Sequence, residues 1–172
     1  MFRFLQYCAL TALALVAAAP STRAPAQSYP SKPVTIIVPL AAGTGMDTLA
    51  RIYAEQLSQA LGKPVVIENK PGAGLMLGAA AIAAAPPDGH MLGISTATPM
   101  AVNQVLYKKL SYDPDKDFSP VYFYVKSPFV LVVNPALPIN SVPELIKYAK
   151  DAAKPMSYST PGPGTSQHLS ME

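Results

Sequence analysis

The chain has 172 residues, of which 50% are hydrophobic and 13% are charged, with a formal net charge of +3. This length and composition suit a folded domain of ordinary size and exclude a disordered tail.

The first 26 residues have the pattern of a cleaved secretory leader. Arg3 precedes an uncharged, mostly apolar stretch over residues 4–19, and Ala24-Pro25-Ala26 offers small residues to a signal peptidase. A membrane anchor is the alternative, but the stretch is short and rich in alanine. Without this leader the chain is close to neutral and has no cysteine. A nucleic-acid surface, disulfides and thiolate chemistry are therefore excluded.

Apolar runs then alternate with segments of helical period. The predicted strands are 34–40, 64–68 and 90–96, and the predicted helices are 48–61, 75–85 and 99–106. Asp47 is the expected cap of the first helix, and Gly62 marks its end. This alternation predicts an α/β fold with a parallel sheet flanked by helices.

A polar loop over residues 108–120 leads into a second α/β pattern. The predicted elements there are two strand-like runs within 121–135, a helix at 141–154 with a capping box of Ser141 and Glu144, and a strand at 156–160. We expect a first domain at 27–126 and a second at 127–172. Both are predicted to be incomplete, as in the N-terminal part of a longer protein.

Three predicted turns join a strand end to a helix start: 42–47, 69–74 and 160–166. Ligands of open parallel sheets bind at this edge, and helix N-termini there favour anions. Gly45-Met46-Asp47 has no lysine where a Walker A loop needs one, which argues against a nucleotide. The glycines at 72, 74 and 78 do not match a dinucleotide fingerprint, and close packing of a helix on the sheet is the alternative.

Catalytic and metal-binding constellations are not visible in the sequence. His90 is expected at the surface, and His168 either contacts a ligand or bonds at a helix start. The acidic residues of 113–117 are interpreted as a solvated loop because the rest of a calcium signature is missing. Arg51 is the only arginine after the leader, with Asp47 as its default partner. A bound carboxylate would therefore rely on backbone N–H groups and hydroxyls.

Several segments, taken in order, resemble one family. These are "YPSKPVTIIVPLAAGTGMDTLARIYAEQL", "GKPVVIENKPGAGLMLGAAAIAAAPPDGHML", "LSYDPDKDFSPV" and "STPGPGTSQHLSME". From about Tyr29 to the end, the chain is similar to the substrate-binding receptors of tripartite tricarboxylate transporters, the Bug receptors. The resemblance implies a periplasmic type II binding protein with two domains and no cofactor. Such a receptor holds a small organic carboxylate and delivers it to membrane transporter subunits.

The resemblance also implies a ligand site between the turn after the first strand and the Gly-rich turn of the second domain. The candidate ligand-binding residues are Ala42, Gly43, Thr44, Gly45, Asp47, Ser95, Thr96, Thr98, Thr160, Gly162, Gly164, Thr165, Ser166 and His168. The family usually has Gly-Gly-Gly-Thr-Asp, or a close variant, where this chain has Gly43-Thr44-Gly45-Met46-Asp47. The identity of the carboxylate therefore stays open.

Three alternatives to a transport receptor remain. The chain could sense a ligand for a signalling partner, or it could be a truncated fragment without function. An enzyme has the least support, because the residues show no nucleophile–base pair and no metal cluster.

Overall fold

The computed structural model describes residues 28–172, and the predicted leader at 1–26 lies outside that range. The chain divides into two compact units, residues 1–31 and 32–172, and the second contains all the described helices and strands. Within the described range, no helix combines the length and the apolar character that crossing a membrane requires.

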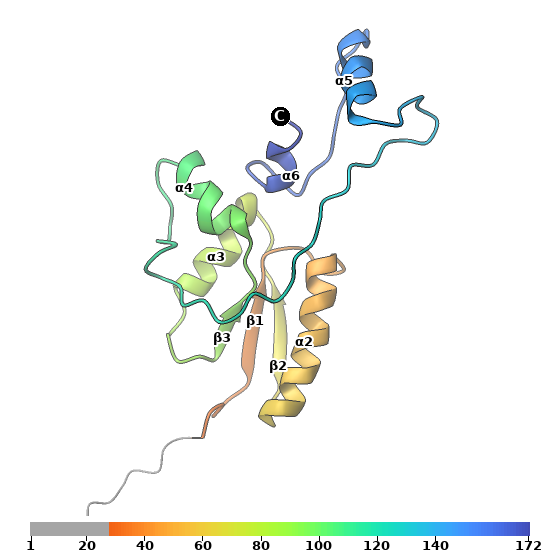
Figure 1. Ribbon diagram of the computed structural model, residues 1–172. Helices are drawn as coiled ribbons and strands as arrows, with labels where there is room; N and C mark the ends of the chain where they lie inside the picture. Colours follow the sequence, from red (N-terminus) through yellow and green to blue (C-terminus); the bar gives the residue numbers. More distant parts are fainter. Residues whose placement is uncertain (1–27) are drawn as a thin grey trace, which may run out of the picture. The chain divides into compact units, whose positions relative to one another are not determined.

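A three-stranded parallel sheet lies at the centre of the second unit (Figure 1). Its strands are β1 (Val34–Val38), β2 (Val65–Asn69) and β3 (Met91–Gly93), in the order β2-β1-β3. Ile36 of β1 lies opposite Ile67 on one side and Leu92 on the other. The side chains of β1 are the best buried of the sheet, as its continuous apolar run predicts for a central strand.

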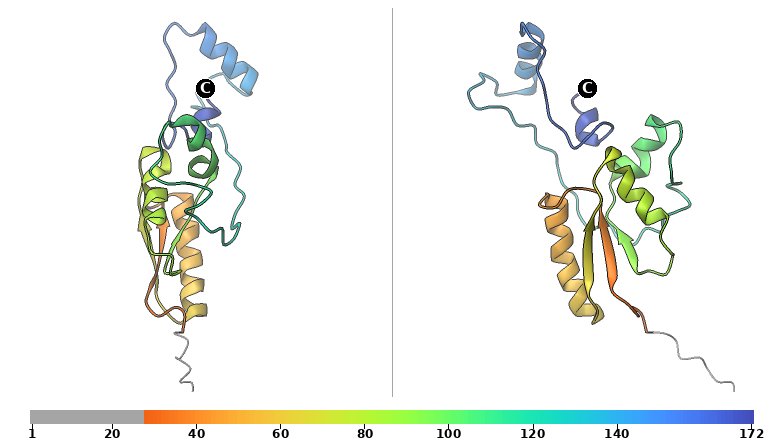
Figure 2. Two further views of the ribbon diagram at one scale, coloured as in Figure 1. Left: turned by 90° about the vertical axis from the view of Figure 1, so that its left-hand side faces the viewer. Right: turned by 180° about the vertical axis from the view of Figure 1, so that it is seen from behind.

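Two helices cover opposite faces of this sheet (Figure 2). The helix α2 (Gly45–Leu61) packs on β1 and β2, and α3 (Met76–Ala83), which follows the short turn η1 (Ala73–Leu75), packs on β1 and β3. A Cβ at Gly78 would lie 2.7 Å from the Cβ of Pro39, so α3 approaches β1 more closely than a larger residue allows. The close-packing interpretation of this glycine-containing segment is therefore confirmed at Gly78.

The ends of α2 show one correct and one wrong prediction. Gly62 ends the helix with φ of 65°, a left-handed conformation that glycine adopts without strain. Asp47 is not the cap. The N-cap is Thr44, whose hydroxyl accepts the Asp47 N–H, because the helix begins three residues earlier than the apolar period indicates.

The predicted helix at 99–106 is confirmed as two joined pieces. A wide π-helical turn, η2 (Thr98–Val102), continues into α4 (Asn103–Leu106). Tyr112, from the loop that follows, donates its hydroxyl to the Pro99 carbonyl at 2.8 Å. This bond ties the start of the polar loop back to the helical segment.

The strands predicted within 121–135 and at 156–160 are wrong for this structure. Residues 119–134 run as an extended chain with no strand, and residues 156–160 likewise form none (Figure 1). A strand needs a neighbour for its backbone N–H and C=O groups, and residues 28–172 supply none for these runs. The apolar side chains of 121–133 are accordingly mostly exposed.

Two helices follow this extended segment. In α5 (Val142–Asp151), the Ser141 hydroxyl accepts the Glu144 N–H, so the predicted N-cap is confirmed. The Glu144 carboxylate accepts the N–H of Asn140 and not that of Ser141, so the reciprocal bond of the predicted capping box is displaced by one residue. The apolar face of α5 is not buried among the described residues. The short helix α6 (Ser166–Leu169) begins after the Gly-rich turn, with Thr165 as its N-cap.

Candidate functional site

The turn at 42–47 lies at the carboxyl end of β1 and leads directly into α2. Its exposed part comprises Ala42, Gly43 and Gly45, where small residues leave the backbone accessible. Thr44 is half-buried, and its hydroxyl is already hydrogen-bonded within the turn. It donates to the Ala41 carbonyl at 2.9 Å and also caps α2. This turn therefore presents mainly backbone groups, and few free side-chain groups, to a ligand.

The side chain of Asp47 is engaged by other groups of the protein. Its side chain is buried, and its carboxylate accepts hydrogen bonds from the Arg51 guanidinium, the Gly43 N–H and the Asn69 amide. These bonds, led by that from Arg51, hold the pKa of Asp47 well below its usual range. Asp47 therefore carries its charge at neutral pH and directs it toward the protein, not toward a ligand.

Two backbone donors of the turn remain available. Within the described residues, no hydrogen-bond acceptor lies opposite the N–H of Gly45 or of Met46, which are the first two residues of α2. The next N–H, that of Asp47, is taken by the Thr44 hydroxyl. Unpaired N–H groups at the start of a 17-residue helix attract an anion through both hydrogen bonding and the helix dipole.

The Gly-rich turn at 160–168 is built in a similar way. Thr165 is buried, and its hydroxyl donates to the Gly162 carbonyl at 2.8 Å while accepting the His168 N–H. Gly162 and Gly164 both have positive φ. His168 has a buried Nδ1 without a partner among the described residues, and its Nε2 lies 3.8 Å from Glu172.

This second turn lies against the first α/β segment. A Cβ at Gly74 would come within 2.9 Å of the Pro163 carbonyl, and one at Gly164 within 2.7 Å of Leu106. Asn103 is fully buried beside them and donates to the Gly74 carbonyl at 3.3 Å. The two glycines thus permit a close backbone approach between segments far apart in sequence.

The third predicted group, after β3, is only partly available. Ser95 is exposed, whereas Thr98 is buried at the start of η2. The Thr96 hydroxyl is buried and has no partner in the described part of the chain. Because the strands are parallel, this turn shares the carboxyl edge of the sheet with 42–47.

The structure therefore brings together some predicted residues and not others. Turns 42–47 and 95–98 share one edge, and 160–168 meets η1 and α4, but no described hydrogen bond joins 42–47 to 160–168. Sequence reasoning missed Asn69 and Asn103. The position of Asn69 at the end of the second predicted strand was the available signal; Asn103 gave none, because its neighbours are distant in sequence.

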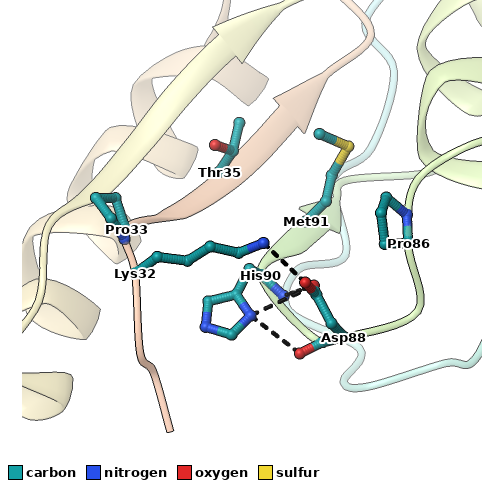
Figure 3. Close-up of a pocket in the computed structure, with 7 residues that line it drawn as sticks. All are labelled: Lys32, Pro33, Thr35, Pro86, Asp88, His90 and Met91. Carbon is teal, nitrogen blue, oxygen red and sulfur yellow. Dashed lines mark hydrogen bonds and ion pairs between the residues drawn. The ribbon is translucent and has the colours of Figure 1, made fainter.

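A cavity of about 230 Å³ lies at the opposite edge of the sheet, near the starts of β1 and β3 (Figure 3). Its charged groups are already engaged: the Lys32 ammonium lies 2.8 Å from Asp88, whose carboxylate also accepts the His90 N–H. His90 is not the surface residue expected, since its side chain is only 10% exposed. Paired charges make this cavity a poor anion site.

Groups of three acidic, cysteine or histidine residues that could hold a metal ion are not found in the described range. Asp113, the first residue of the acidic loop, accepts bonds from the Asp115 N–H and the Lys116 ammonium. This segment folds on itself as a polar loop.

Comparison with known proteins gives consistent matches. The family model described as tripartite tricarboxylate transporter family receptor matches residues 49–172. A UPF0065 protein of Bordetella pertussis is 38% identical over 163 residues, covering 95% of this chain and 50% of the relative. The chain spans about half the length of the curated relatives it matches.

Solved structures agree with these matches. An R. palustris protein with adipate is 36% identical, with a TM-score of 0.77, and the match covers 83% of this chain and 48% of that one. The periplasmic binding protein BugD is also 36% identical, with a TM-score of 0.68 over 82% of this chain and 47% of that one. The predicted periplasmic-binding-protein architecture, represented here by about half of such a chain, is confirmed.

Proposed function

The chain belongs to the tripartite tricarboxylate transporter receptor family, and we propose that it forms part of a receptor that binds a small organic carboxylate at the turn 42–47. The observation that carries this proposal is the pair of unpaired N–H groups, on Gly45 and Met46, at the start of α2. They can bind one end of a carboxylate without a buried cation, which suits a ligand that must be released.

The relative whose solved structure contains adipate supports a linear dicarboxylate as the first ligand to test. The hydroxyl-rich turns at 95–98 and 160–168 are the proposed source of contacts to the rest of the ligand. We propose that residues 27–126 and 127–172 belong to two domains that approach each other when the ligand is bound. An enzymatic role has no specific observation in its favour.

Delivery of the ligand to a membrane transporter is the proposed biological role. Receptors of this family are periplasmic, and an exported receptor would meet its transporter subunits there. A sensor for a signalling partner would bind the same ligand. Deleting the gene and measuring carboxylate uptake and ligand-dependent gene induction separately distinguishes the two roles.

The binding proposal is tested by NMR titration of the ¹⁵N-labelled chain with adipate. The amide signals of Gly45 and Met46 are expected to shift most, and 1,6-hexanediol, which has the same length without charge, is expected to leave them unchanged. A folded chain whose 42–47 amides ignore adipate would contradict the proposal.

A further inference from the structure

We propose that Arg51 and Asn69 are positioning residues for the anion-binding turn: they neutralise and lock Asp47, so that the N–H groups of Gly45 and Met46 can take a carboxylate. The inference rests on the proposed function for its ligand. It assigns to these side chains a role in shaping the site and no contact with the ligand.

The carboxylate of Asp47 is fully engaged by protein donors. Its Oδ1 accepts Arg51 Nη2 at 3.0 Å and Asn69 Nδ2 at 2.9 Å. Its Oδ2 accepts Arg51 Nε at 3.0 Å and the Gly43 N–H at 2.9 Å. Each carboxylate oxygen thus accepts two hydrogen bonds from the protein. Because only 2% of Asp47 is exposed, a ligand has little access to its carboxylate.

Asn69 connects this carboxylate to the sheet. Its Nδ2 also donates to the Leu40 carbonyl at 2.9 Å, and its Oδ1 accepts Arg51 Nη2 at 3.3 Å. Since Asn69 is the last residue of β2 and Leu40 follows β1, one amide links two strand ends to the start of α2. An aspartate there would face a second carboxylate, and a leucine would leave the donors and acceptors unpaired.

The Gly43 N–H is the point at which this network fixes the turn. Gly43 has φ of 85°, which glycine adopts readily, and its N–H bond to Asp47 holds the chain in that conformation. The turn therefore enters α2 with the N–H groups of the next residues in a defined orientation. Without the network, the turn would have to be ordered by the ligand itself, which lowers affinity.

Charge makes Arg51 necessary. Asp47 lies one residue beyond Met46, so an uncompensated carboxylate would repel an anion bound to the Gly45 and Met46 N–H groups. The bidentate guanidinium cancels that charge while remaining about half exposed, at 53% of its side chain. A pair that is neutral as a whole preserves the attraction of the helix start for anions.

Arg51→Gln tests the charge argument with adipate as the probe. It is expected to weaken adipate binding about tenfold, by leaving Asp47 uncompensated. The double variant Asp47→Asn/Arg51→Gln removes both charges and is expected to recover most of that loss. Lys63→Gln, which removes the same charge from the far end of α2, is expected to bind as the unaltered chain does.

A double variant as weak as Arg51→Gln would overturn the charge argument, because removal of the Asp47 charge would then have restored no binding. Equal binding by Arg51→Gln and the unaltered chain would overturn it as well. Both variants change exposed or isosteric groups, so their folding is checked by amide signal dispersion before titration.

Amide exchange provides a readout that does not depend on any ligand. In Asn69→Ala the Gly43 amide is expected to exchange about tenfold faster, since its acceptor is no longer held. An unchanged rate in a folded Asn69→Ala chain would overturn the positioning role. If Asn69→Ala does not fold, the exchange rate of the Gly43 amide in Arg51→Gln is measured instead, and an unchanged rate there would overturn the positioning role. Failure of the unaltered chain to bind adipate would contradict only the proposed function.

Discussion

At the scale of single residues, the site depends on backbone conformations that few side chains permit. Gly74 and Gly62 have nearly equal φ, 60° and 65°, but different surroundings. A Cβ at Gly74 would meet the Pro163 carbonyl, whereas a Cβ at Gly62 would have nothing within 4 Å. The two positions therefore separate the cost of the backbone conformation from the cost of the contact.

Gly74→Ala is expected to displace the turn that contains Pro163, because a backbone oxygen at 2.9 Å cannot remain there. The buried Thr165 would become accessible, and its amide is expected to exchange at least about tenfold faster. Gly62→Ala is the matched control, costing about 1 kcal/mol for its left-handed φ and leaving Thr165 protected. Equal Thr165 exchange in both variants would refute the contact.

The ion pair of Lys32 and Asp88 is expected to contribute to stability in a pH-dependent way. The Lys32 ammonium, and next the His90 N–H, lower the pKa of Asp88 from 3.8 to about 2. A lowered pKa stabilises the fold above the unfolded value near 3.8 and loses that contribution as the pH falls through 2. Lys32→Ala is expected to raise the Asp88 pKa toward 3.8, measured by NMR titration of its carboxyl carbon.

Lys63→Ala is the control for this titration, since Lys63 is also exposed but forms no ion pair with Asp88 among the described residues. An Asp88 pKa that stays near 2 without the Lys32 ammonium would show that the backbone donor alone lowers it.

At the scale of elements, local chemistry sets where the helices begin and end. Thr44, Ser141 and Thr165 each cap a helix by accepting an N–H three residues ahead. Such caps replace the hydrogen bonds that the first turn of a helix lacks, and they act within a few residues. The helix α5 depends more on its cap than α2 does, because α5 has no residue buried among the described residues whereas α2 has three.

Ser141→Ala is expected to destabilise α5 by about 1 kcal/mol, because the Glu144 N–H loses its acceptor. The measurement is amide exchange over residues 144–148. Glu144→Gln keeps an acceptor for the Asn140 N–H and is expected to change those rates little. Unaltered exchange in Ser141→Ala would mean that packing, and not the cap, holds α5.

At the scale of the whole molecule, apolar exposure is concentrated in the segment 121–133. The large exposed side chains there are Val121, Tyr122, Phe123, Val125, Phe129, Val130, Leu131, Val132 and Val133. Tyr53 of α2 contacts this segment: its hydroxyl donates to the Tyr124 carbonyl at 3.3 Å, and its ring packs edge-on against the Tyr124 ring. An extended apolar segment with unpaired backbone groups favours association between chains.

The 172-residue chain is therefore expected to self-associate at micromolar concentration in sedimentation velocity. Val130→Lys/Val132→Lys is expected to reduce association by charging the segment. Gln56→Lys/Gln59→Lys, which adds the same charge on the exposed side of α2, serves as the control. A monodisperse monomer before any substitution would contradict this expectation.

Short-range features could be predicted from the sequence alone. Val34–Val38 forms a central strand because its run is continuously apolar, and Gly62 ends α2 because glycine accepts the left-handed conformation. The N-cap of α5, Ser141, is also predicted correctly, because its bond reaches an N–H only three residues ahead. The family was also accessible from the sequence, since its motifs are short segments of defined order, and the resemblance is confirmed over residues 49–172.

The tertiary structure decided what depends on distant partners. The pair of Asp47 and Arg51, four residues apart, is predicted by the sequence and confirmed. The bond from Asn69, 22 residues from Asp47, is not predicted, because only the fold brings its amide to that carboxylate. The runs within 121–135 have strand-like sequences without strands, because β-structure requires a neighbour and the described residues provide none. Caps and turns are satisfied within a few residues, whereas a ladder and a buried carboxylate need groups that only folding brings together.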